Sequence, residues 1–184
     1  MDDALPYSHP LRRTGLAQRK PTRFSLAPDA AESGRIAAAL GITELRNATF
    51  KGEIRPLGRT DFGLEAVLDA EVVQPCVSTL APVVTRLHET ALRRYQADWQ
   101  EPDAEEYEMP EDDSLEPLGE VIDVGAVMVE AIALALPLYP HAPGAKPADV
   151  TVTAPGAEPL SNDRPKPFAD LARLLKKADK DDAG

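Results

Sequence analysis

The chain of 184 residues has few of the residues that usually carry catalysis or bind metals. Its single cysteine, Cys76, excludes an intramolecular disulfide framework. Its histidines, His9, His88 and His141, have no metal-ligand spacing to Cys76, so we predict a buried structural cysteine. A glycine-rich phosphate loop and the GxSxG, HExxH and paired CxxC motifs are all missing. These absences argue against an enzyme, and we predict no cofactor and no small-molecule substrate.

Aromatic and basic residues are also scarce. Aromatic residues make up 5% of the chain, so we expect an aliphatic core. The 20 Lys and Arg against 31 Asp and Glu give a formal net charge of −11, which repels a polyphosphate at long range. This balance favours a basic ribosomal or assembly protein as the partner over naked RNA, although rRNA contact stays open.

No stretch combines the length and the lack of charge that a membrane span needs. The longest apolar run, Val121 to Lys146, contains Asp123 and Glu130, and a charge at mid-membrane is costly. We therefore predict a buried core helix over Val124 to Ala135, capped by Asp123 and ended by Pro137. The N-terminus has no apolar signal segment, so we expect a cytoplasmic protein without a membrane partner.

Charge and proline content divide the chain into segments. We expect a flexible basic arm over residues 1–21, a single α+β domain over 22–140, a proline-rich linker over 141–163, a helix motif over 164–177 and a disordered tail over 178–184. The domain carries an acidic insertion, residues 98–116. This tract is either a solvated loop or a mimic of nucleic acid that binds a basic protein.

Local signals predict one further helix in the domain. Asp29 is a candidate N-cap, an alanine-rich stretch follows it, and Gly41 is a candidate stop. We therefore expect a helix over Ala30 to Leu40.

Alternation of apolar and polar residues predicts the strands. Thr22–Leu26 favours a short strand, and two alternating runs on either side of a turn at Pro56–Asp61 predict an antiparallel hairpin. A third alternating run covers Val83 to Leu92. The predicted fold class is α+β, a small curled antiparallel β-sheet packed with two or three helices, plus the acidic loop and a proline-rich C-terminal tether.

Three groups of residues are candidates for partner binding. Arg12 and Arg13 belong to a basic, acid-free stretch that is either a solvated arm or a contact to an RNA phosphate backbone. Glu130 either faces a partner or holds a basic side chain, or it lies on the solvent face or in a buried salt bridge. Apolar side chains on one side of the C-terminal helix motif are candidate anchors in a partner groove: Phe168, Leu171 and Leu175.

Several motifs follow one another in a recognisable order. They are Val72–Leu80 (VVQPCVSTL), the acidic insertion, Ile122–Gly125 leading to Glu130 and Leu134–Pro137, and Pro167–Lys176 (PFADLARLLK). This order resembles the bacterial and plastid YceD family, which is linked to accumulation of large-subunit ribosomal RNA. The last motif is similar to the family's terminal NPFxxLxxL signature, with Lys166 in place of Asn.

The resemblance implies a role in ribosome assembly or rRNA processing and no defined reaction. Many relatives have a CxxC-like pair where this chain has Cys76 and Thr79, and a cysteine-rich segment where it has Tyr139–Gly144, so a metal site is not supported here. We expect a non-enzymatic factor that supports 23S rRNA accumulation or ribosome assembly by binding a basic protein or rRNA.

Two alternatives stay open. One is an rRNA-processing hydrolase with a carboxylate-bound metal, for which Asp61, Asp69 and Glu71 are the candidates. The other is a structural subunit of a protein complex.

Overall fold

The computed structural model describes residues 5–98 and 115–145. The chain divides into two compact units, residues 1–145 and 146–184, and the second lies outside the described residues. The predicted helix motif over 164–177, the tail and most of the linker fall in that second unit. Residues 99–114, which form most of the acidic insertion, also lie outside the described residues.

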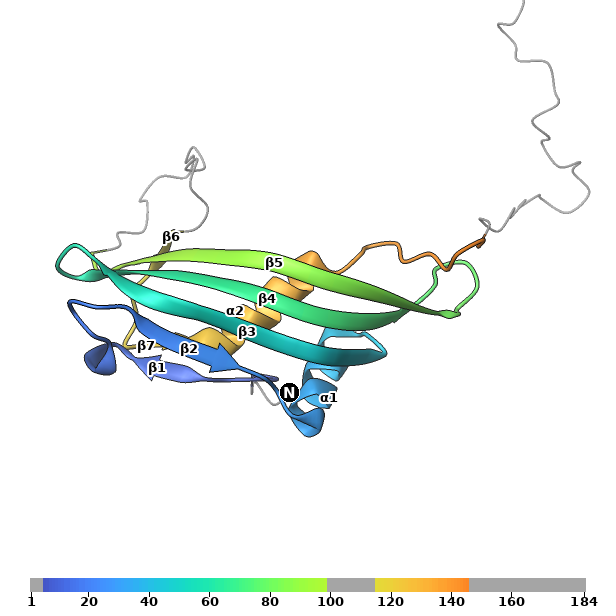
Figure 1. Ribbon diagram of the computed structural model, residues 1–184, viewed down its shortest axis with the longest axis horizontal. Coiled ribbons are helices and arrows are strands. Elements are labelled where there is room, and N and C mark those ends of the chain that lie inside the picture. The colour runs from blue at the N-terminus through green and yellow to red at the C-terminus, as the bar shows by residue number, and fades with distance from the viewer. Residues whose placement is uncertain (1–4, 99–114, 146–184) are drawn as a thin grey trace, which may run out of the picture. The chain divides into compact units, whose positions relative to one another are not determined.

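The described residues form a five-stranded sheet in the order β2-β3-β4-β5-β6 (Figure 1). Its strands are β2 (Thr22–Leu26), β3 (Glu44–Leu57), β4 (Asp61–Pro75), β5 (Pro82–Gln96) and β6 (Leu115–Pro117). The β3–β4 hairpin and the third alternating run are confirmed. The sheet is mixed and not wholly antiparallel, because β6 pairs with the end of β5 in parallel. The end of the predicted acidic loop is therefore a strand.

Both predicted helices of the domain are confirmed with their caps. Helix α1 (Ala30–Leu40) begins at a capping box: the Asp29 carboxylate accepts from the Glu32 N–H at 2.8 Å, and the Glu32 carboxylate accepts from the Asp29 N–H at 2.8 Å. It ends at Gly41, whose φ of 65° is left-handed. Helix α2 (Val124–Ala135) is capped by Asp123 and ends before Pro137. No helix in the described ranges is long and apolar enough to cross a membrane.

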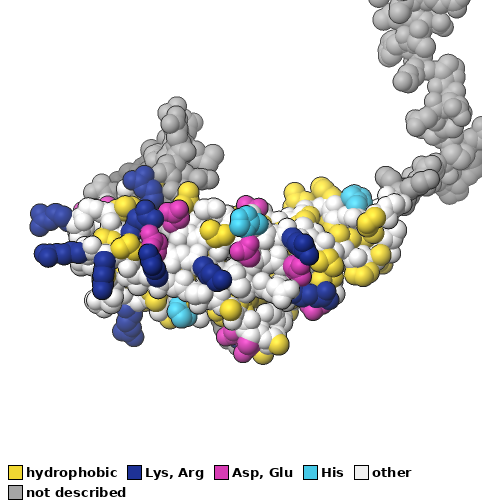
Figure 2. Space-filling model, viewed as in Figure 1, with side chains coloured by type: hydrophobic (Ala, Val, Ile, Leu, Met, Phe, Trp, Pro, Cys, Tyr) yellow, Lys and Arg dark blue, Asp and Glu magenta, His cyan; other side chains and the backbone are white. Residues whose placement is uncertain are grey.

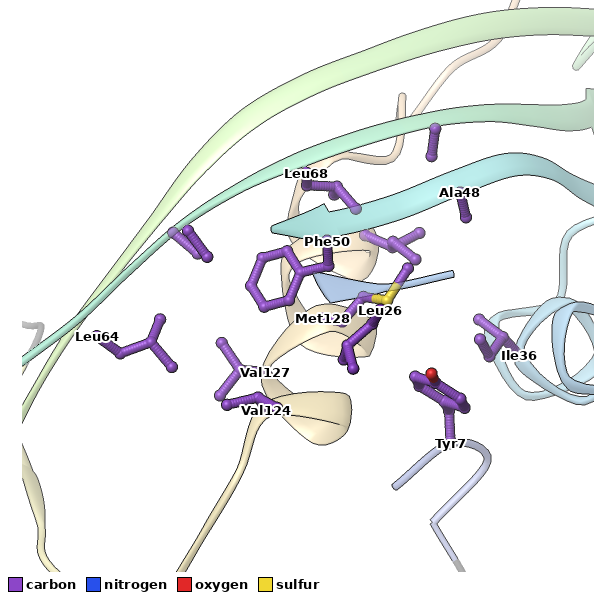
Figure 3. Packing of buried hydrophobic residues seen from close by; sticks show 14 of the residues in the cluster. Tyr7, Leu26, Ile36, Ala48, Phe50, Leu64, Leu68, Val124, Val127 and Met128 are labelled. Carbon is purple, nitrogen blue, oxygen red and sulfur yellow. The ribbon is translucent and has the colours of Figure 1, made fainter. Parts of the chain in front are cut away.

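The core lies between the sheet and the two helices (Figure 3). Alternate residues of β4 point into it, as the period of two predicts: Leu64, Ala66, Leu68, Ala70 and Val72 are all buried. Val124, Met128 and Ile132, each four residues apart on α2, are fully buried opposite them. A buried side chain of this size contributes about 1.5–3 kcal/mol.

Residues 5–16 belong to the packed domain, where we expected a flexible arm. Strand β1 (Pro10–Arg12) pairs with β7 (Val121–Asp123), a short 3₁₀ turn η1 (Arg13–Gly15) follows, and Tyr7 and Leu16 are buried. The sequence of this segment is polar and basic, but its backbone is held by a residue more than a hundred positions away.

Asp123 holds that segment. Its carboxylate accepts from the Ser8 hydroxyl at 2.5 Å and from the His9 N–H at 2.7 Å, while also capping α2 through the N–H groups of Gly125 and Ala126. A Cβ on Gly125 would lie 2.6 Å from the His9 nitrogen, so this position requires glycine for the close approach. Burial raises the pKa of Asp123, but the hydrogen bonds outweigh it and the pKa lies below its usual value.

Candidate functional site

Basic side chains from separate parts of the chain gather at one end of the five-stranded sheet. The strand register aligns Arg55 of β3 and Arg94 of β5 on either side of Gly63 in β4. Arg59 lies in the turn between β3 and β4 at this same end. The loop that precedes β2 is attached here by a hydrogen bond from the Ala17 N–H to the Thr22 hydroxyl.

The β1–η1 segment reaches the same end. The Arg13 N–H donates to the Glu120 carbonyl, and the Leu118 N–H donates to the Gln96 carbonyl at the end of β5. We call this region the basic end. Its exposed cations are Arg12, Arg13, Arg19, Lys20, Arg23, Arg55, Arg59 and Arg94.

Only part of this charge is compensated within the described residues. Arg55 pairs with Glu53 at 2.9 Å and Glu65 at 2.8 Å. Arg12, Arg13 and Arg59 form no ion pair with another described residue. Figure 2 shows several Lys and Arg side chains gathered at the left, at the end of the β3–β4 turn, and others spread along the rest of this face. A locally basic surface therefore exists on a chain of net charge −11.

Glu130 lies on α2 and holds Arg93 of β5 at 2.6 Å. Arg93 also pairs with Glu116 of β6 at 2.8 Å, and its side chain is only 17% exposed. Burial raises the pKa of Glu116, although Arg93 partly lowers it. Arg93 thus links β5 to β6 and to α2. The Glu130 carboxylate is half exposed, and it forms an ion pair within the domain.

The connection between β4 and β5 meets the segment that follows α2. The Val77 N–H donates to the Pro140 carbonyl at 3.0 Å, and the Ala142 N–H donates to the Cys76 sulfur at 3.3 Å. Cys76 is fully buried here, outside the main core cluster. Two motifs of the family resemblance, some sixty residues apart in the chain, are therefore neighbours in the fold.

The surroundings of Cys76 stabilise its thiolate. The Thr79 hydroxyl, together with the backbone N–H groups of Ala142 and Ser78, lowers the pKa of Cys76 to about 6, and burial opposes this only in part. The described residues contain no group of three or more metal-ligating side chains, so the residues present do not fit a metal at this junction.

The structure does not bring all three hydrolase carboxylates together in the described part of the chain. Asp61 and Glu71 are ten residues apart on β4, on the order of 33 Å. Asp69 is engaged with His88 at 2.6 Å, and Glu71 pairs with Arg86 at 3.0 Å. The Asp69 contact raises the pKa of His88. Asp69 and Glu71 lie two residues apart on the same face of β4, and each has its own cationic or imidazole partner there.

The predicted binding residues divide into three groups. Arg12 and Arg13 lie together at the basic end, whereas Glu130 is on α2, facing β5. Phe168, Leu171 and Leu175 lie outside the described residues. Sequence reasoning missed Arg55, Arg59 and Arg94, which join the N-terminal cations only through the strand register. The predicted hairpin turn contained the signal for Arg59, because a hairpin places its turn at one end of the sheet.

Comparison with known proteins adds one match. A family model described as "Large ribosomal RNA subunit accumulation protein YceD" covers residues 64–175, more than half of the chain. No curated protein and no solved structure matches. The matched range begins in β4 and includes β5, Cys76, Asp123 and α2. The chain belongs to the YceD family.

Proposed function

We propose that this protein is a non-enzymatic factor that supports large-subunit (23S) rRNA accumulation or assembly, and that its basic end contacts the RNA. Family membership supports the role. The gathering of cations at one end of a chain with net charge −11 is the observation that carries the RNA contact. Arg12 and Arg13 are part of that surface.

The chemistry of the basic end suits a phosphate backbone. Exposed guanidinium groups bind phosphate oxygens and release the counterions condensed on the nucleic acid. Contacts of this kind position a protein on RNA but do not read its sequence. The proposed role is therefore to hold or protect folded rRNA, and it needs no reacting groups.

RNA binding by the full-length protein tests the contact. Replacing Arg12, Arg13 and Arg59 by Gln should weaken binding to 23S rRNA fragments. The slope of log affinity against log salt should become shallower by about 0.7 for each phosphate group that the protein no longer neutralises. Fluorescence anisotropy across a salt series measures both quantities.

A control variant has the same net charge as the variant that lacks Arg12, Arg13 and Arg59. Arg35, Arg46 and Arg86 lie away from the basic end, on α1 and on the far parts of β3 and β5. Replacing these three by Gln lowers the net charge by the same amount, and the salt slope should stay as in the wild type. Equal losses in both triple variants would mean that overall charge, and not the basic end, governs binding.

The cellular role has its own test. Deletion of the gene should lower the level of large-subunit rRNA relative to small-subunit rRNA, and the wild-type gene should restore it. Normal large-subunit rRNA in the deletion strain would contradict the proposed role even if RNA binding occurs in vitro.

A second candidate mode is binding of a basic ribosomal or assembly protein. The net charge of −11 supports it, because such a chain attracts basic proteins at long range. Capture of partners from lysate with and without nuclease separates the two modes. Partners that remain after nuclease treatment favour a direct protein contact, and loss of all partners contradicts it.

A further inference from the structure

The edge of β5 is long and open in the described part of the chain. Strand β4 pairs with one side of β5 along its whole length, but β6 pairs with the other side only at Arg94–Gln96. No other described strand pairs with this side over Pro82–Arg93. The opposite edge of the sheet, β2, has only five residues.

This edge lacks three of the structural features that protect edge strands from strand addition, although it does carry charged side chains. Edge strands are normally blunted by bulges, internal prolines or short length. The β4–β5 register is unbroken from Phe62↔Tyr95 to Pro75↔Pro82, and the only proline of β5 is its first residue. A row of backbone N–H and C=O groups is therefore available to an incoming strand.

A groove of about 280 Å³ lies beside the edge, between β5 and α2. Small side chains create the hollow, namely Ala91 on the strand and Ala131 and Ala135 on the helix. Leu134 lines the groove with its side chain 75% exposed. An apolar surface of this kind on an otherwise charged domain suits the stems of long side chains.

The charge around the groove is negative. Glu89 lines it and is exposed, and Glu130 lies one turn before Leu134 on the same face of α2. Arg93 is the cation on this side, and it is already held by Glu116 and Glu130. Lysine or arginine side chains pointing toward α2 could lay their stems across the alanines and place their charges beside Glu89 and Glu130.

We propose that the open edge of β5 over Pro82–Arg93, together with this groove, binds an extended basic segment of a partner protein as an additional strand. The backbone of β5 supplies the hydrogen bonds, and the groove and its carboxylates supply the preference for basic residues. The proposal rests on the protein-binding mode of the proposed function and supplies its site. It shares no residue with the RNA-binding test at Arg12, Arg13 and Arg59.

Amide hydrogen exchange on the full-length protein tests the strand addition. In the free protein, the β5 amides that point away from β4 should exchange quickly. A synthetic peptide of alternating lysine and valine, as long as the open edge, should protect those amides. A peptide of alternating glutamate and valine should not protect them.

Paired substitutions test the groove. Leu134→Lys should weaken binding of the lysine–valine peptide about tenfold, because it removes apolar surface and adds a like charge. Leu138→Lys makes the same chemical change at a side chain that is 86% exposed and does not line the groove, and binding should be unchanged. Glu89→Gln should weaken binding less, and mainly at low salt.

Several results would overturn the proposal. Protection of the outward β5 amides in the free protein would mean that the edge is already paired. Protection that is independent of protein concentration would point to another part of this chain, and protection that grows with concentration would point to a second copy. Equal effects of Leu134→Lys and Leu138→Lys would place binding elsewhere. The Arg12, Arg13 and Arg59 variant should bind the peptide normally, so failure of RNA binding and failure of peptide binding are separable.

Discussion

At the scale of single residues, Asp123 and Asp29 differ in the number of contacts that they make. Both cap helices, but Asp123 also binds Ser8 and His9. Asp29→Ala should lower the free energy of unfolding by about 1 kcal/mol, as for an ordinary cap. Asp123→Ala should lower it by about 3 kcal/mol, because it also removes the charge-assisted hydrogen bonds to the N-terminal segment.

Urea unfolding followed by circular dichroism measures both variants. Because the pKa of Asp123 is below its unfolded value, its contribution is complete above about pH 4 and is lost as the pH falls through the folded pKa. Equal costs for the two variants would show that the hydrogen bonds to Ser8 and His9 contribute little.

Cys76 and Thr79 give a residue-scale prediction about titration. Thr79→Val should raise the pKa of Cys76 from about 6 toward its ordinary value, because the Thr79 hydroxyl is the strongest stabiliser of the thiolate. Ser78→Ala should leave the pKa unchanged, because Ser78 acts through its backbone N–H. Ultraviolet absorbance of the thiolate during a pH titration distinguishes the two variants.

The same shift has a consequence for stability. The folded pKa of Cys76, about 6, lies below the unfolded value of about 8.5, so folding favours the thiolate. The free energy of unfolding should rise from about pH 6 to about pH 8.5, and the contribution is lost as pH falls through 6. In Thr79→Val this rise should shrink. An unchanged pH profile would mean that the thiolate is not selectively stabilised.

At the scale of elements, two helical glycines should respond in opposite ways to the same substitution. Gly34→Ala in α1 meets open space and should stabilise the protein by about 0.5–1 kcal/mol. Gly125→Ala in α2 would press its Cβ against the backbone of Ser8 and His9 and should destabilise by about 2 kcal/mol. Thermal unfolding of the two variants checks the signs. Stabilisation by both would mean that the N-terminal segment moves aside without cost.

The elements that could be predicted are those with local signals. Capping residues and alanine content located α1, Asp123 and Pro137 bounded α2, and a period of two located β3, β4 and β5. The β1–β7 pair was missed because each strand has three residues, too few for a period, and the pairing joins distant segments. β6 was missed because it ends at a proline directly after an acidic tract. The basic end depends on the strand register between long strands, which composition does not determine.

At the scale of the whole molecule, the acidic tract begins and ends at the basic end. Asp98 lies two residues after the end of β5 at Gln96, and Leu115 pairs with Arg94 at the start of β6. Replacing the carboxylates of residues 99–114 by amides should raise RNA affinity roughly tenfold at low salt, because negative charge attached near the cations repels phosphate. The gain should fade as the screening length falls to about 10 Å near 0.1 M salt.

A double-mutant comparison checks this prediction. The amide replacement should have little effect in the variant that lacks Arg12, Arg13 and Arg59, since the two sets of charges act on the same RNA. The measurement is anisotropy with 23S rRNA fragments at several salt concentrations. Equal gains in both backgrounds would mean that the tract acts only through net charge.

The clamp between Ser8 and Asp123 also determines when the domain can be completed during synthesis. Residues 8–12 are synthesised before their partners in β7 and the first turn of α2, which follow more than a hundred residues later. At about 5–20 residues per second, residues 5–16 wait several seconds for Asp123 to emerge. Residues 5–16 thus lack these native neighbours until Asp123 is made, and the cations Arg12 and Arg13 are accessible to nearby RNA throughout that interval.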